Sequence, residues 1–106
     1  MYKEPRPIIV CKKCDISIQG SATHYSEPRA YLENIGDYVS VEVALFSKNG
    51  EWLNPKDDAL FIGFTGLEEL QELYEEGRTA VGSYVPLALL ESLLLFLAGK
   101  EQNDKL

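Results

Sequence analysis

The chain has 106 residues, 45% of them hydrophobic and 25% charged, and its formal net charge is −7. This length and apolar content suit one globular domain whose core needs no metal or disulfide bond, and they argue against bulk disorder. All of the excess negative charge lies in residues 51–106, where eleven Asp and Glu outnumber four Lys and Arg. Such a field repels nucleic acid phosphates and attracts basic protein surfaces, so we expect no direct contact with nucleic acid.

The first predicted strand follows an amino-terminal segment that lacks the apolar core of a secretion signal. Residues 8–10 open this strand, and the period-two alternation of residues 14–18 resumes it. Pro28 suits a first helical turn and Gly36 suits a left-handed stop. We therefore expect a short helix at residues 30–35.

Residues 38–46 form the clearest strand of the chain, because apolar side chains at positions 39, 41, 43 and 45 fall on one face. Asn49 and Gly50 follow this strand, and both tolerate the positive φ of a tight type I′ hairpin turn. Residues 51–53 begin the return arm of the hairpin. After a polar break, residues 59–64 form a further short strand.

Two helices are predicted in the last third of the chain. Thr65 begins the first, Glu68 stands at capping-box spacing from it, and Gly77 is a suitable stop. Pro86 opens the last helix and Gly99 ends it. The segment between these two helices is predicted as a connection.

The order of these elements predicts an α+β fold class. We expect an antiparallel sheet of three or four strands with a short connecting helix and two carboxy-terminal helices packed on one face. Residues 1–99 are predicted to form this single domain, and residues 100–106 a polar, flexible tail.

Cys11 and Cys14 form the one motif with obvious chemistry, and three interpretations of it stay open. Zinc requires four ligands, commonly thiolate or imidazole, whereas this chain offers two thiols and one imidazole, His24; Asp15, Glu27 or a second subunit would have to complete the site. A redox pair needs a thiol beside a helix amino terminus, which the following alternation does not predict, although the two intervening lysines are expected to lower the thiol pKa. We favour the third interpretation, two reduced thiols beside a turn and no cofactor, because a lone CxxC is a weak pattern.

Sequence patterns of the known catalytic sets are missing, so we expect a protein that is not an enzyme. The chain has no Gly-x-Ser-x-Gly elbow, no phosphate-binding glycine loop followed by lysine and no His-Glu-x-x-His pair. A single histidine also leaves little general-base capacity near neutral pH.

The helix predicted at residues 65–77 has one face made of carboxylates. Its acidic positions follow an i, i+1, i+4, i+7, i+8 pattern: Glu68, Glu69, Glu72, Glu75 and Glu76. No lysine or arginine lies in this face, and each like-charged pair at i, i+4 costs about 0.2–0.5 kcal/mol. One interpretation is a solvated face that keeps an acidic protein soluble. The other is a docking face for a partner protein with a basic surface.

The last predicted helix has an apolar arc that covers about half of its circumference, whereas one sheet face covers roughly 100° of a helix. The first alternative is that the preceding helix and the loops cover the surplus. The second, which we prefer, is a homodimer, because exposed apolar patches mark contacts. The self-association residues are then Leu89, Leu93, Phe96 and Leu97. The apolar stretch is interrupted by Glu91 and is shorter than the ~20 residues that a bilayer requires, so we expect no membrane contact.

The sequence as a whole favours a small acidic intracellular binding protein. We predict an inhibitor, an immunity-type protein or a phage-type antagonist that docks its acidic helix face on a basic protein surface. The alternative is a small metal- or thiol-dependent protein that uses Cys11 and Cys14. Two cysteines at this spacing do not form the framework of a secreted disulfide-rich domain, so we expect a cytoplasmic location.

Overall fold

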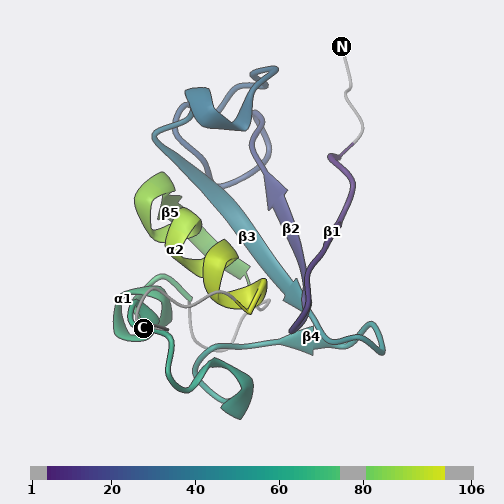
Figure 1. Ribbon diagram of the computed structural model, residues 1–106. Coiled ribbons are helices and arrows are strands. Elements are labelled where there is room, and N and C mark those ends of the chain that lie inside the picture. The colour runs from purple at the N-terminus through teal and green to yellow at the C-terminus, as the bar shows by residue number, and fades with distance from the viewer. Residues whose placement is uncertain (1–4, 75–80, 100–106) are drawn as a thin grey trace.

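The fold, seen in a computed structural model that describes residues 5–74 and 81–99, combines an antiparallel sheet with helices. The sheet has five strands: β1 (Ile9–Val10), β2 (Asp15–Gln19), β3 (Ser40–Phe46), β4 (Trp52–Leu53) and β5 (Val81–Pro86). The central strand is β3, because β2 pairs with one of its edges while β4 and β5 share its other edge at opposite ends (Figure 1). The predicted combination of an antiparallel sheet with two carboxy-terminal helices is confirmed.

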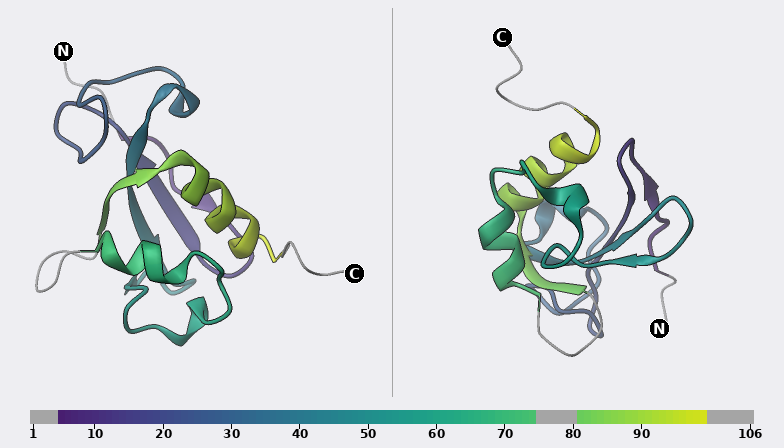
Figure 2. Two further views of the ribbon diagram at one scale, coloured as in Figure 1. Left: turned by 90° about the vertical axis from the view of Figure 1, so that its left-hand side faces the viewer. Right: turned by 90° about the horizontal axis from the view of Figure 1, so that it is seen from below.

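Four helical segments complete the described part of the fold: the 3-10 helices η1 (Ile35–Asp37) and η2 (Ala59–Phe61), and the α-helices α1 (Leu67–Glu72) and α2 (Leu87–Leu97). In the right-hand view of Figure 2, both α-helices lie on one side of the molecule and β1 lies on the other. Pro86 caps the start of α2, and Gly99 follows its end with a φ of +81°. These are the start and the left-handed stop that the sequence predicts for this helix.

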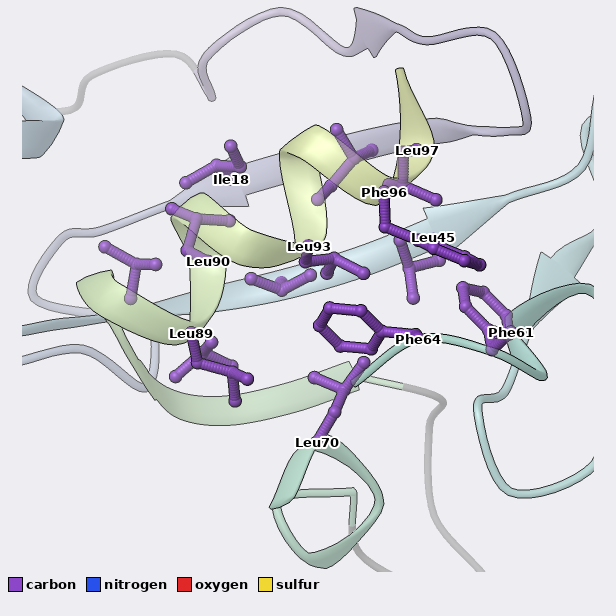
Figure 3. Close-up of a cluster of buried hydrophobic side chains, with 14 of the residues drawn as sticks. Ile18, Leu45, Phe61, Phe64, Leu70, Leu89, Leu90, Leu93, Phe96 and Leu97 are labelled. Atoms are coloured by element: carbon purple, nitrogen blue, oxygen red, sulfur yellow. The ribbon is translucent and has the colours of Figure 1, made fainter. Parts of the chain in front are cut away.

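The hydrophobic core lies between α2 and one face of the sheet. Ile16 and Ile18 of β2 pair in register with Leu45 and Val43 of β3, so these four side chains share a face. Figure 3 shows Ile18 and Leu45 beside apolar residues of α2, and Phe61, Phe64 and Leu70 from the chain before β5 belong to the same cluster. Burying one leucine side chain stabilises the fold by about 1.5–3 kcal/mol. This cluster of buried side chains joins α2 to the sheet.

The prediction of a short helix at residues 30–35 is wrong, since only the 3-10 turn η1 forms there. Side chains from other parts of the chain satisfy the backbone of this segment. The Tyr38 hydroxyl accepts the backbone N–H of Leu32 at 2.8 Å and lies 2.7 Å from the Ala30 carbonyl oxygen. The Arg6 guanidinium donates to the Leu32 carbonyl oxygen. These contacts replace the hydrogen bonds that a helix would form.

Two predictions about strands are also wrong. Residues 59–64 form η2 and a turn, because Phe61 and Phe64, three positions apart, both enter the core. Conversely, β5 forms where the sequence predicts a connection. It pairs with the part of the β3 edge that β4 leaves open. Gly82 allows the backbone of β5 to pass close to Tyr74, because a Cβ at this position would lie only 2.9 Å from the Tyr74 ring.

The predicted hairpin between β3 and β4 is confirmed, but its turn is not type I′. The Gly50 N–H donates to the Ser47 carbonyl oxygen at 2.9 Å, and the Ser47 N–H donates to the Glu51 carbonyl oxygen at 2.8 Å. Gly50 has a φ of +84°, whereas Asn49 has no positive φ. This is a three-residue loop that ends in a bulge glycine, so Gly50 alone carries the left-handed conformation of the turn.

The helix predicted at residues 65–77 is shorter in the structure. Its N-cap is Gly66, without a side-chain hydrogen bond, so the predicted capping box of Thr65 and Glu68 is wrong. The helix ends at Glu72 because Tyr74 leaves it to form an isolated bridge with Gly82 of β5. The predicted stop at Gly77 and the predicted tail at residues 100–106 lie outside the described residues.

Candidate functional site

Three carboxylates of α1 face the solvent. Glu68, Glu69 and Glu72 are exposed, whereas Leu70 is fully buried in the core. The predicted separation of an acidic face from an apolar face therefore holds over α1. The two other glutamates predicted for this face, Glu75 and Glu76, lie outside the described residues.

A hollow of about 340 Å³ lies beside two of these glutamates. Glu68 and Glu72 line it together with Gln71 of the same helix and Lys56 of the preceding loop. Gln71 Nε2 donates a hydrogen bond to the Pro55 carbonyl oxygen at 3.0 Å, which holds α1 against that loop. Within the part of the chain that the structure describes, the three glutamates of α1 form no ion pair.

The acidic surface continues into the segment before α1. Residues 51–72 contain six Asp and Glu and a single lysine. Asp57 is exposed, and Asp58 accepts the Asn54 N–H through Oδ2 at 2.7 Å. The helix dipole favours carboxylates in the first turn of α1 but opposes Glu72 at its end. The local charge pattern attracts cations at some cost to the stability of the helix.

The four residues predicted to form a dimer surface lie in the core of the chain instead. Leu89, Leu93, Phe96 and Leu97 of α2 are between 0 and 6% exposed. Figure 3 shows them among side chains from the sheet, from α1 and from the segment around η2. They offer no surface to a second copy of the chain, because the domain itself covers this part of the apolar arc. A homodimer stays a prediction, but these residues do not support it.

Another part of the apolar arc of α2 remains open to solvent. Leu95 is 46% exposed, and Leu87 and Leu94 are half-buried. An open groove of about 390 Å³ is lined by Ile35, Leu87, Ala88, Leu90, Glu91 and Leu94. The surplus apolar surface that the sequence predicts is therefore present, but on other residues of the same helix.

The two cysteines lie at the bend between β1 and β2, and neither thiol is activated. Cys14 is fully buried, Cys11 is half-buried, and they form no disulfide bond. Burial raises the pKa of Cys14 to about 11 and also raises the pKa of Cys11. The prediction that Lys12 and Lys13 lower these pKa values is wrong. Desolvation dominates, and the opposing positive charge comes from Lys48.

The third metal ligand considered, His24, lies at the far end of β2 from the cysteines. Cys14 precedes β2 and His24 follows it, and a five-residue strand spans about 16 Å. The His24 Nδ1 atom lies 2.6 Å from Ser21 Oγ. Among residues 5–74 and 81–99, no three His, Cys, Asp or Glu side chains gather as a metal site. The described residues therefore offer no donor set for zinc at this position.

One cluster that the sequence analysis missed lies where β3 and β5 pair. It contains Tyr25, Glu42 and Tyr84, whose rings and carboxylate meet across three separate segments. Tyr84 reaches this position through a φ of +56°. No sequence signal marks such a backbone conformation at a tyrosine, because it is uncommon there.

Comparisons with family models, with curated proteins and with solved structures find no match to this chain. In the described residues, no helix is both long enough and apolar enough to cross a membrane.

Proposed function

We propose that this chain is a small acidic binding protein, an inhibitor, immunity-type protein or phage-type antagonist, that docks α1 on the basic surface of another protein. The observation that carries the proposal is the set of three exposed glutamates on α1 that form no ion pair in the described part of the chain. A surface helix built for stability alone would alternate Glu with Lys at i, i+4 spacing. Here no ion pair within the described part of the chain offsets these carboxylates.

The surroundings of α1 support docking in two ways. The carboxylates of residues 51–72 add to a field that attracts a basic surface over a distance, which raises the association rate. The hollow beside Glu68 and Glu72 has room for a basic side chain of the partner. Because the hydrogen bond of Gln71 fixes α1 to its neighbouring loop, little ordering of this surface is needed on binding.

A homodimer and a cytoplasmic location belong to the same proposal. The groove between η1 and α2 supports a contact between copies, since open apolar surface marks interaction sites. Two thiols that form no disulfide bond are consistent with a reducing compartment.

The experiment begins with capture of the partner from host lysate at low salt. The affinity of that partner is then measured for the triple variant Glu68→Gln, Glu69→Gln, Glu72→Gln, which we expect to bind at least tenfold more weakly. The matched control, Glu33→Gln with Asp37→Asn and Glu91→Gln, removes three exposed carboxylates outside residues 51–72 and keeps the same net charge as the test variant. Equal affinities for the two variants would contradict a specific role of α1.

A further inference from the structure

The cluster at β5 is built on a bulge. The register between β3 and β5 shifts between Val41 and Val43, so two residues of β5, Ser83 and Tyr84, face the single residue Glu42. Tyr84 adopts the left-handed backbone conformation, with a φ of +56°. A bulky aromatic residue rarely enters this region. The bulge also frees the Tyr84 N–H from the ladder with β3.

Two backbone hydrogen bonds hold Tyr25 between Glu42 and Tyr84. The Tyr25 N–H donates to Glu42 Oε1 at 3.0 Å, and the Tyr25 carbonyl oxygen accepts the Tyr84 N–H at 3.1 Å. The two tyrosine rings consequently stand 5.9 Å apart at an angle of 46°. They are 45% and 39% exposed. Two aromatic faces and one carboxylate are thus fixed in place and open to solvent.

The charges around the rings favour a cation. The Arg29 guanidinium lies 5.3 Å from the centre of the Tyr25 ring, which shows that this ring accepts a guanidinium group. In the described residues Glu42 forms no ion pair. Glu27 adds a second carboxylate, 3.3 Å from the hydroxyl of Ser40, which lies on the same face of β3 as Glu42. Within the described residues, these contacts bring together two carboxylates and the guanidinium group of Arg29.

We propose that Tyr25, Tyr84 and Glu42 bind the guanidinium group of an arginine side chain on a protein partner. A planar guanidinium stacks on aromatic rings and pairs with a carboxylate at the same time, whereas the ammonium of lysine is a compact point charge. The arginine of the partner competes with Arg29 for the Tyr25 ring and, unlike Arg29, also pairs with Glu42. This inference goes beyond the proposed docking of α1, because the site contains none of the glutamates of α1.

The backbone of Tyr84 supports a role for its ring. Asparagine or glycine adopts a φ of +56° with less strain than tyrosine does. A position selected for stability alone would therefore carry one of those residues. We expect Tyr84→Asn to unfold no more easily than the wild-type protein while it loses most of the arginine binding.

The test is a titration of the ¹⁵N-labelled protein with N-acetyl-arginine methylamide, with N-acetyl-lysine methylamide as the comparison ligand. The arginine probe is expected to shift the Tyr25 and Tyr84 amide signals in a saturable way, with a dissociation constant on the order of 1 mM or weaker. We expect Tyr84→Asn and Glu42→Gln to weaken binding at least fivefold. Gln keeps an oxygen that accepts the Tyr25 N–H, so Glu42→Gln removes charge while it preserves the hydrogen bond.

Two further variants complete the design. Arg29→Gln removes the internal competitor, so it is expected to tighten binding severalfold. Trp52→Leu removes an exposed aromatic ring from β4 and is the control whose affinity stays unchanged. The proposal is overturned if the amides show no saturable shift, if the lysine probe binds equally well, or if Arg29→Gln leaves the affinity unchanged. Because Arg29 is exposed, this last result is decisive even when another variant folds poorly.

Discussion

Replacing Leu93 by alanine tests whether the apolar face of α2 belongs to the core of a single chain. Leu93 is 0% exposed and lies in the centre of the cluster that joins α2 to the sheet (Figure 3). Removing a leucine side chain from a fully packed site costs about 2–5 kcal/mol, because the transfer free energy is lost and a cavity remains. A domain of this size has a total stability of about 5–15 kcal/mol, so the loss takes a large part of it.

The measurement is equilibrium unfolding in urea at two protein concentrations, with Leu95→Ala as the matched control on the same helix. Leu95 is 46% exposed, so its truncation is expected to cost less than about 1 kcal/mol. The loss for Leu93→Ala is expected to be independent of concentration, since the contacts are intramolecular. A stability loss that grows with protein concentration would refute this reasoning and would place Leu93 in a dimer interface.

Two further predictions concern Cys14 and Gly50. The pKa of Cys14 is raised from 9.0 to about 11. The stability that the buried, neutral thiol contributes is therefore fully present below pH 9. It is lost as the pH rises to 11, because the thiol of the unfolded chain is ionised in this range. Urea unfolding at several pH values should show a loss of up to about 1.4 kcal/mol per pH unit in this window, and a Cys14→Ala variant with an unchanged slope would contradict the assignment. Gly50→Ala should cost about 1 kcal/mol through its φ of +84° alone, because the added Cβ meets no atom within 4 Å. Gly36→Ala, equally uncrowded but without a positive φ, is the control for thermal unfolding, and equal melting temperatures for the two variants would show that the turn tolerates alanine.

Elements whose signals are local in the sequence are predicted well. The alternation within residues 38–46 identifies β3, because Val41, Val43 and Leu45 meet the core. The strand begins at Ser40, however, and Val39, which the pattern placed on the same face, is 70% exposed. Pro86 lies one residue before α2 and Gly99 two residues after it, since proline starts and glycine stops a helix through their own backbone preferences. The acidic face over α1 follows from the same logic, because helical spacing alone separates its glutamates from Leu70.

Elements that depend on distant partners are not predicted. The segment of β5 contains Gly82 and Ser83 and becomes a strand only because β3 presents an open edge to it. The backbone near Leu32 stays irregular because Arg6 and Tyr38 supply its hydrogen bonds. Neither partner is visible in the local pattern, so tertiary contacts override the propensities there.

The burial of the predicted self-association residues is linked to the structure of residues 59–64, which the sequence assigned to a strand. A strand at these positions would place Phe61 and Phe64 on opposite faces, so only one of the two rings would pack against α2. In the structure both enter the core, and the Phe64 ring lies 5.3 Å from the Phe96 ring. A helical wheel of α2 measures the width of its apolar arc but does not show which segment covers it. Phe61 and Phe64 belong to the same buried cluster as Leu89 and Phe96. This explains why Leu89 and Phe96, which the sequence assigned to self-association, are buried within the chain.

We propose that α1 steers a basic partner to this protein, and the association rate tests this proposal most directly. The rate is measured with the captured partner at low and at physiological ionic strength, for the wild type, for the glutamine variant of Glu68, Glu69 and Glu72, and for the charge-matched control. We predict that the α1 variant associates about tenfold more slowly than the control at low salt, and that the difference shrinks near 0.15 M, where charges are screened beyond about 8 Å. Equal association rates for the α1 variant and the control at low salt would contradict the claim.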